Sequence, residues 1–235
     1  YENQSVLLMG YNKKDEQKIL KMEKLRHSTS HVMAQAVLEM FPEAKIAIGP
    51  AIENGFYYDF ELPRTLTNED LEKIESKMKE LAKKDCPFTE EKITKEQAEK
   101  LFKNQLYKLE LIRDLFIKEK NPALSIYRHA DFYDLCKGPH IENVNRINPQ
   151  AIKLLSTSGA YWRGDEKRPM LQRIYGTVWP DKKGLVAYLT QLEEAKKRDH
   201  NKLGREMELF TTSDLVGQGL PLLAPKGAKI KQILQ

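Results

Sequence analysis

The sequence contains only two cysteines, Cys86 and Cys136, among 235 residues. They do not form a CxxC pair, which excludes a zinc-ribbon spacing and a disulfide framework and favours a reducing compartment. Long apolar runs are absent too, because no segment approaches the roughly 20 residues that cross a bilayer. Residues 1–4 (YENQ) lack the basic and apolar regions of a signal peptide. We therefore expect a cytoplasmic protein with no membrane partner.

Neither sign of charge dominates the chain. The 39 basic and 34 acidic residues give a net charge of +5, which permits contact with nucleic acid but does not require it. Hydrophobic residues make up 40% of the chain, enough for a core that folds without covalent or metal crosslinks. Helical and strand patterns alternate without internal repeats. The fold class predicted is α/β (α+β), with a mixed or antiparallel sheet packed against helices.

Local patterns predict the individual elements. Apolar residues at helical spacing indicate a helix over residues 23–40, which Phe41 and Pro42 end. The Asn54-Gly55 dipeptide predicts a hairpin or tight return between strands, and Thr67 and Thr94 each begin a capped helix. The other predicted elements are strands over residues 45–48, 55–62, 124–133, 152–155 and 171–178, and one long charged helix over residues 182–205.

The densest group of reactive side chains comes from two distant segments. His27 and His31 lie four residues apart and therefore share one face of the predicted helix. Residues 134–140, which include Cys136 and His140, are predicted to form a loop, because Gly138 and Pro139 cannot continue a strand. Taken together, the four offer the nitrogen and sulfur ligands of tetrahedral zinc.

A zinc metalloprotease helix would carry glutamate beside its first histidine, where this chain has Ser28. The alternative is a metal-free hydrolytic pocket, in which a neutral imidazole activates water. Spacing alone does not separate these two possibilities.

Several sequence blocks resemble the editing domain of bacterial-type threonyl-tRNA synthetase. They keep the family's order and cover roughly residues 23–210. The blocks are residues 25–31 (LRHSTSH), 48–50 (IGP), 55–59 (GFYYD), 134–140 (DLCKGPH), 159–165 (GAYWRGD), 170–177 (MLQRIYGT) and 195–200 (AKKRDH).

The resemblance implies a two-part editing domain with a central cleft, followed by a long linker helix. It assigns residues 1–20 to the end of a small N-terminal domain, 21–181 to the editing (second additional) domain, 182–208 to the linker helix and 209–235 to the truncated start of a class II catalytic core. ATP, Mg and Zn would belong to the missing core, so this chain is not expected to aminoacylate. The parent enzyme would be a homodimer through that core.

The implied reaction is hydrolysis of the ester in tRNA(Thr) that carries serine. A synthetic site that accepts threonine rejects serine through one methyl group, worth about 1–3 kcal/mol, so a second sieve is required. The implied partner is the acceptor end of tRNA(Thr) carrying serine, and editing itself would need no cofactor.

Site residues follow from the resemblance position by position. His27 would organise or activate the attacking water, while His31 and His140 would line the pocket. Lys108 would polarise the ester or steady the developing oxyanion, although without the resemblance it reads as a surface lysine. Cys136 would be a small polar wall in preference to a nucleophile.

Two further residues would bind the seryl group, and a basic set would contact tRNA. Asp134 would bind the ammonium group, and Tyr58 would bound the space where the methyl of threonine would lie. Contacts to tRNA phosphates are assigned more weakly to five basic residues: Arg163, Arg173, Lys196, Lys197 and Arg198. The assignment is weaker because acidic residues precede the 196–198 run at a distance that allows ion pairs.

Two other classes of protein remain possible at this point. One is a zinc-dependent aminoacyl-tRNA deacylase of the alanyl editing type, which would use His27, His31, Cys136 and His140 as metal ligands. The other is a non-catalytic tRNA-binding module. Bound metal would distinguish the first, and loss of hydrolysis with retained tRNA binding would distinguish the second.

Overall fold

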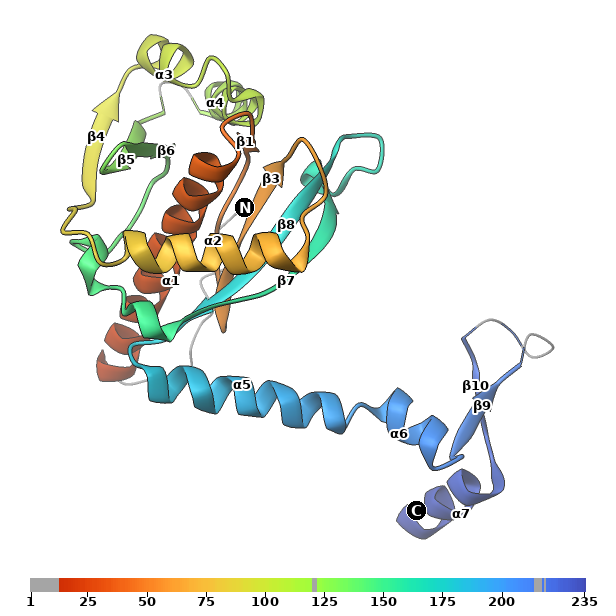
Figure 1. Cartoon of the computed structure of the whole chain (residues 1–235). Helices are drawn as coiled ribbons and strands as arrows, with labels where there is room; N and C mark the ends of the chain where they lie inside the picture. The colour runs from red at the N-terminus through yellow and green to blue at the C-terminus, as the bar shows by residue number, and fades with distance from the viewer. Residues whose placement is uncertain (1–12, 120–121, 214–216, 218) are drawn as a thin grey trace. The chain divides into compact units, whose positions relative to one another are not determined.

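The computed structural model describes residues 13–119, 122–213, 217 and 219–235. The chain divides into two compact units, Tyr1–Leu185 (unit 1) and Val186–Gln235 (unit 2). Every strand pair among the described residues is antiparallel, and helices pack against the sheets of unit 1 (Figure 1). The predicted fold class is therefore confirmed. The domain boundaries at residues 20, 181 and 208 stay predictions.

Helix α1 (Lys13–Met40) carries the first two histidines and begins earlier than residue 23, where we predicted its start. Residues 28–37 in its second half are all buried, including polar Ser28, Thr29 and Ser30. The helix ends at Met40, just before Phe41 and Pro42, because the residue before a proline disfavours helical geometry.

The larger sheet of unit 1 places strands in the order β1 (Lys45–Ile46), β3 (Gly55–Glu61), β8 (Met170–Val178) and β7 (Ile152–Tyr161), with β2 (Ala51–Ile52) also paired to β3. Ile52 pairs with Gly55, which confirms the predicted tight return. Strand β7 runs well beyond residue 155, where we predicted its end. Apolar residues of α1, α2 (Asn68–Leu81) and this sheet form the main core.

Capping residues set the helix starts as predicted. Thr67 and Asp70 form a reciprocal capping box at α2, and Thr94 and Gln97 form one at α3 (Lys95–Leu101). Because each box satisfies two backbone N–H groups locally, the sequence alone locates these helix ends.

A smaller sheet in unit 1 contains β4 (Thr89–Ile93), β5 (Leu124–His129) and β6 (Phe132–Leu135). Helices α3 and α4 (Leu106–Lys118) share a second apolar cluster with it. Two predictions were wrong here. Residues 124–133 are not one strand, because the chain reverses at Ala130 (φ 47°) and His129 pairs with Phe132. Asp134 is a strand residue and not part of the loop.

Unit 2 contains most of α5 (Lys182–Lys197), then α6 (His200–Glu206), β9 (Phe210–Thr212), β10 (Pro221–Leu223) and α7 (Pro225–Leu234). The single helix predicted over residues 182–205 is therefore wrong. Asp199 lies between the two helices, and its side chain accepts a hydrogen bond of 2.9 Å from the Lys202 N–H, which starts α6. None of the helices among the described residues combines the length and apolar character of a membrane span.

Candidate functional site

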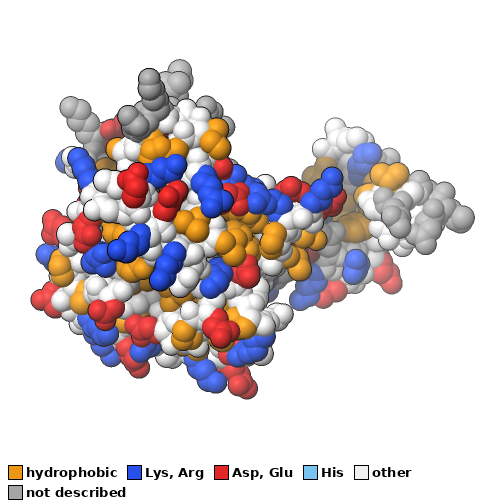
Figure 2. Space-filling model, turned by 90° about the horizontal axis from the view of Figure 1, so that it is seen from above, with side chains coloured by type: hydrophobic (Ala, Val, Ile, Leu, Met, Phe, Trp, Pro, Cys, Tyr) orange, Lys and Arg blue, Asp and Glu red, His pale blue; other side chains and the backbone are white. Residues whose placement is uncertain are grey.

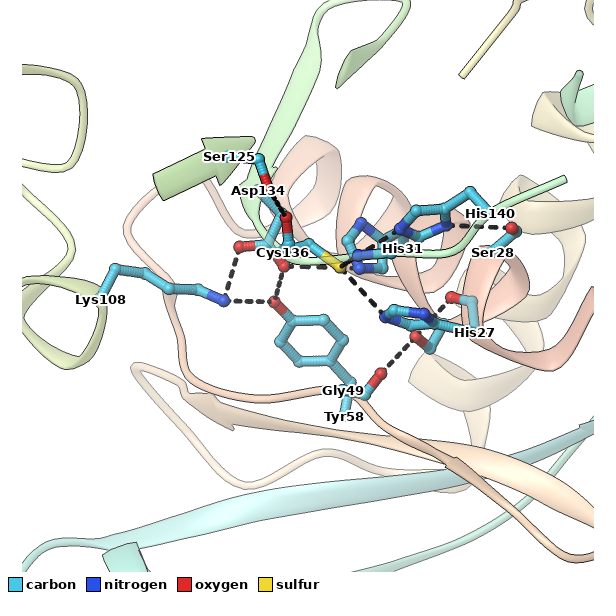
Figure 3. A network of polar contacts seen from close by, with 12 residues as sticks. His27, Ser28, His31, Gly49, Tyr58, Lys108, Ser125, Asp134, Cys136 and His140 are labelled. Carbon is cyan, nitrogen blue, oxygen red and sulfur yellow. Dashed lines mark hydrogen bonds and ion pairs between the residues drawn. The ribbon is translucent and has the colours of Figure 1, made fainter. Parts of the chain in front are cut away.

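The two histidine-bearing segments meet inside unit 1. His27 and His31 project from one face of α1, and the loop after β6 brings Cys136 and His140 against them (Figure 3). The ligand atoms of these four residues all lie within 4.8 Å of one another. The site therefore depends on a contact between segments about a hundred residues apart in the sequence.

The Cys136 thiol lies between two imidazoles. Its Sγ is 3.4 Å from Nε2 of His27 and 3.3 Å from Nε2 of His140, and it accepts a hydrogen bond of 3.2 Å from the Gly138 N–H. Burial is the main cause that raises the pKa of this thiol to about 12. A thiol that stays protonated at neutral pH is a poor nucleophile. The wall role of Cys136 stays a prediction.

The three site histidines are neutral near pH 7. Burial, the largest cause in each case, lowers the pKa of His27, that of His31 more strongly, and that of His140 to about 2. The ring centroid of His140 lies 4.3 Å from that of His27 and 4.5 Å from that of His31. At these distances a positive charge on one ring disfavours a positive charge on the others. Neutral imidazoles can accept a proton from water.

A buried charged pair lies beside the imidazoles. Lys108 Nζ is 2.5 Å from Asp134 Oδ1, and both side chains are only 3% exposed. The Tyr58 hydroxyl donates to Asp134 Oδ2 at 2.5 Å and accepts from Lys108 Nζ at 3.1 Å. Burial raises the pKa of Tyr58 well above its usual value, which keeps that hydroxyl a donor. Lys108 is therefore not the surface lysine that its local pattern indicates.

A cavity of about 400 Å³ opens beside these groups. Its charged, polar and sulfur-bearing lining comes from His27, His31, Lys108, Asp134 and Cys136, and residues 48–50 supply part of the wall.

Two predicted site residues are absent from the described lining of this cavity. The Tyr58 ring is fully buried against Gly49, and His140 lies behind Cys136. Direct contact of either with a substrate stays a prediction.

The sequence analysis gave no site role to several residues found here, among them Tyr57, Leu111 and Ser28. Tyr57 and Leu111 line the cavity, and Ser28 is fully buried with its Oγ 3.0 Å from Nδ1 of His140. The only local signal for Ser28 is its position beside His27, where a zinc metalloprotease helix would carry glutamate. Leu111 lies one helical turn after Lys108, so a helix drawn through Lys108 would have included it.

The predicted tRNA-contacting residues are mostly paired within the chain. Arg163 contacts Glu110 and Asp114, and Arg173 binds the buried Asp59 with a 2.7 Å contact. In unit 2, Lys197 and Arg198 both approach Glu194, and Lys196 is exposed. Basic and acidic side chains are interspersed on the face of unit 1 seen in Figure 2. Their contact with tRNA stays a prediction.

The four clustered side chains also form a donor set of the kind that binds zinc. A tetrahedral ion takes thiolate sulfur at about 2.3 Å and imidazole nitrogen at about 2.0–2.1 Å, and the spacing of these donor atoms fits such a site. All four side chains together would close the shell of a tetrahedral ion, whereas a catalytic ion would be held by three of them and would lower the pKa of a water in the fourth position. Whether editing needs no metal, as we expect, stays a prediction.

We expect the free energy of unfolding of unit 1 to fall as pH is lowered from about 6.5 to 5. Burial lowers the pKa of His129 to about 4, and neither ring nitrogen has a hydrogen-bond partner among the described residues. A histidine whose folded pKa is depressed stabilises the fold above its unfolded pKa, and this contribution is lost at about 1.4 kcal/mol per pH unit below it.

Denaturant unfolding at several pH values would measure this loss. The His129→Phe variant should show a weaker pH dependence, because Phe88 and Phe132 already surround that ring with centroids at 4.6 and 5.1 Å. The exposed His200 supplies the control variant His200→Gln, which should follow the wild type. An identical pH dependence in His129→Phe and wild type would contradict the prediction.

Comparison with known proteins identifies relatives of this arrangement. Residues 124–175 match the family described as the threonyl and alanyl tRNA synthetase second additional domain. A threonine–tRNA ligase of Dehalococcoides mccartyi is 54% identical over 95% of this chain and 38% of its own length. Those of Borrelia hermsii and Citrifermentans bemidjiense are 55% and 56% identical over 90% and 91% of this chain, and 36% and 33% of theirs.

The matched domain includes β5, β6 and the loop with Cys136 and His140, and the curated relatives extend the match to α1 with its two histidines. The chain spans little more than a third of the length of those relatives. Since these relatives are all threonine–tRNA ligases, an alanyl-type assignment is not favoured. The chain belongs to the threonine–tRNA ligase family, as a segment that contains the second additional domain.

Proposed function

We propose that this chain is the editing region of a threonyl-tRNA synthetase and hydrolyses the ester that joins serine to tRNA(Thr). The observation that carries the proposal is the cavity lined by neutral His27 and His31 and by the buried Lys108–Asp134 pair. The cavity thus combines a proton acceptor with a cation. Ester hydrolysis needs both, because a water loses a proton while the carbonyl oxygen gains negative charge.

In the proposed reaction, His27 accepts a proton from water as the water oxygen bonds to the ester carbon. His27 lines the cavity and its Nε2 lies 3.4 Å from Cys136 Sγ, and we assign Nε2 as the nitrogen that takes the proton of that water. The carbon–oxygen bond to the ribose then breaks, and the ribose oxygen takes the proton from His27, which returns that ring to its neutral form. The products are free serine and tRNA(Thr) with its hydroxyl restored.

Lys108 would stabilise the oxyanion that forms in this reaction. Its ammonium group already binds Asp134 and Tyr58, which hold it at a fixed position without solvent reorganisation. Asp134 would bind the substrate ammonium, but its carboxylate is shared with Lys108 from the start. The substrate ammonium would therefore bind a carboxylate that is already paired with Lys108, and not a free carboxylate.

Selection against threonine would come from a rigid cavity wall. The carbonyl of Gly49 accepts a hydrogen bond of 2.6 Å from Ser30 Oγ, and a side chain at Gly49 would collide with the Tyr58 ring. A wall held in this way cannot retreat easily from an extra methyl group, and overpacking a filled space costs about 1–3 kcal/mol. Serine lacks that methyl group.

The proposed partner is the acceptor end of tRNA(Thr) carrying serine. In the parent enzyme, ligation of threonine with ATP and dimerisation would depend on parts of the protein outside this chain.

We expect the chain to hydrolyse seryl-tRNA(Thr) at least about tenfold faster than threonyl-tRNA(Thr), since one methyl group in a tight pocket is worth 1–3 kcal/mol. Release of labelled amino acid from each tRNA, with and without a chelator, would measure the preference. Activity that survives chelation supports a metal-free reaction, and activity that chelation removes would indicate zinc. Hydrolysis of neither substrate, with tRNA still bound, would overturn the proposal and leave a binding module.

A further inference from the structure

Ser28 makes two hydrogen bonds whose directions can be worked out. Its Oγ accepts from the Ile141 N–H at 3.0 Å and lies 3.0 Å from Nδ1 of His140. The side chain is fully buried, and no other hydrogen bond of its hydroxyl is present among the described residues. The hydroxyl proton therefore has one available acceptor, Nδ1 of His140, and a buried hydroxyl left without an acceptor is costly.

The orientation of the His140 ring supports this reading. The ring stacks between Phe88 and His27, with centroids at 4.9 and 4.3 Å. In this orientation Nδ1 meets Ser28 and Nε2 meets Cys136 Sγ at 3.3 Å. Turning the ring over would replace both nitrogen contacts with C–H groups, so the two contacts fix which nitrogen faces Ser28.

A directed chain of hydrogen bonds follows. If Nδ1 of His140 accepts, the proton of this neutral imidazole is on Nε2 and is donated to Cys136 Sγ. The thiol proton of Cys136 is then directed to Nε2 of His27, 3.4 Å away. A neutral His27 that accepts at Nε2 carries its own proton on Nδ1, and Nε2 can take a proton from water once the Cys136 thiol turns away from it.

We propose that Ser28 is a positioning residue that donates its hydroxyl proton to Nδ1 of His140, which keeps the imidazole proton on Nε2 and leaves Nε2 of His27 as the proton acceptor of the site. The proposal deepens the proposed hydrolysis and rests on it for the expected effect on rate. The hydrogen-bond direction itself is independent of any activity. The proposal also makes His140 a hydrogen-bond donor toward Cys136. With its proton on Nε2, His140 neither acts as the general base nor binds a metal through that nitrogen.

Nuclear magnetic resonance of the chain labelled with ¹⁵N-histidine, recorded with a chelator, tests the direction without a substrate. An unprotonated ring nitrogen resonates far downfield of a protonated one, and the His140→Gln variant identifies the signals of His140. We expect unprotonated Nδ1 and protonated Nε2 in the wild type. A protonated Nδ1 of His140 in the wild type would overturn the proposal.

Ser28→Ala tests the consequence, with Thr29→Val as its matched control. Thr29 is equally buried on α1, but within the described part of the chain its hydroxyl bonds only the helix carbonyl of Leu25. We expect the Nδ1 signal of His140 to shift toward a mixture of tautomers in Ser28→Ala and to stay unchanged in Thr29→Val. Hydrolysis of seryl-tRNA(Thr) should fall roughly tenfold in Ser28→Ala only, about the effect of leaving a buried group unpaired.

The outcomes separate the two proposals. An unchanged tautomer in Ser28→Ala, or an equal loss of hydrolysis in both variants, would overturn the role of Ser28. A wild-type chain that shows the expected tautomer but hydrolyses neither aminoacyl-tRNA would overturn the proposed function while leaving the hydrogen-bond direction supported.

Discussion

Replacement of His27 by alanine is expected to lower the hydrolysis of seryl-tRNA(Thr) by about 10²- to 10⁴-fold, because a positioned general base typically contributes that much. His27 is the imidazole that lines the cavity with its Nε2 turned toward Cys136. His31 also lines the cavity, but it lies deeper and is only 2% exposed, which leaves less room for water at its ring. Single-turnover release of labelled serine would measure the loss.

The control for His27→Ala is His200→Ala, which removes an exposed histidine from unit 2 and should keep full activity. Folding of the variant can be followed through tryptophan fluorescence, since Trp162 and Trp179 both lie in unit 1 with the site. A folded His27→Ala variant that hydrolyses within a factor of about two of the wild type would exclude general-base catalysis by this residue.

Local sequence signals predicted the parts of the fold that depend on local chemistry. The capping boxes at Thr67 and Thr94 satisfy backbone groups within one turn, so their helix starts could be read directly. The hairpin between β5 and β6 gave no such signal. Its turn contains Ala130 at a positive φ, a conformation usually left to glycine or asparagine, and pairing of the two strands holds it there.

In the candidate site too, features set by one helix could be predicted, whereas features set by contacts between distant segments could not. The spacing of His27 and His31 is a property of one helix and could be predicted from the residues alone. Lys108 could not, because its sequence neighbourhood is that of a surface lysine and its burial depends on Tyr58 and Asp134 from two strands. Only the family resemblance pointed to it. Ser28 was missed because its importance depends on which atom of a distant loop reaches it.

We expect Lys108→Met to destabilise unit 1 by about 3–5 kcal/mol, the usual cost of removing one partner from a buried ion pair. Methionine keeps most of the length of the side chain but leaves the Asp134 carboxylate with the Tyr58 hydroxyl as its remaining close donor. Denaturant unfolding followed by tryptophan fluorescence would measure the change. The matched control is Lys77→Met, whose pair with Glu39 is partly exposed and should contribute less than about 1 kcal/mol.

A double-mutant cycle would show whether this cost comes from the pair itself. Asp134→Asn removes the charge that Lys108→Met leaves unpaired, so the double variant should be more stable than the sum of the single changes by about 1–3 kcal/mol. Additive costs would mean that Lys108 and Asp134 stabilise the fold independently. Strong coupling would mean that the Asp134 carboxylate is paired with Lys108 before any substrate binds. The ammonium group of the substrate must then weaken this pair as it binds Asp134. Lys108 would thereby become available to the carbonyl oxygen of the ester.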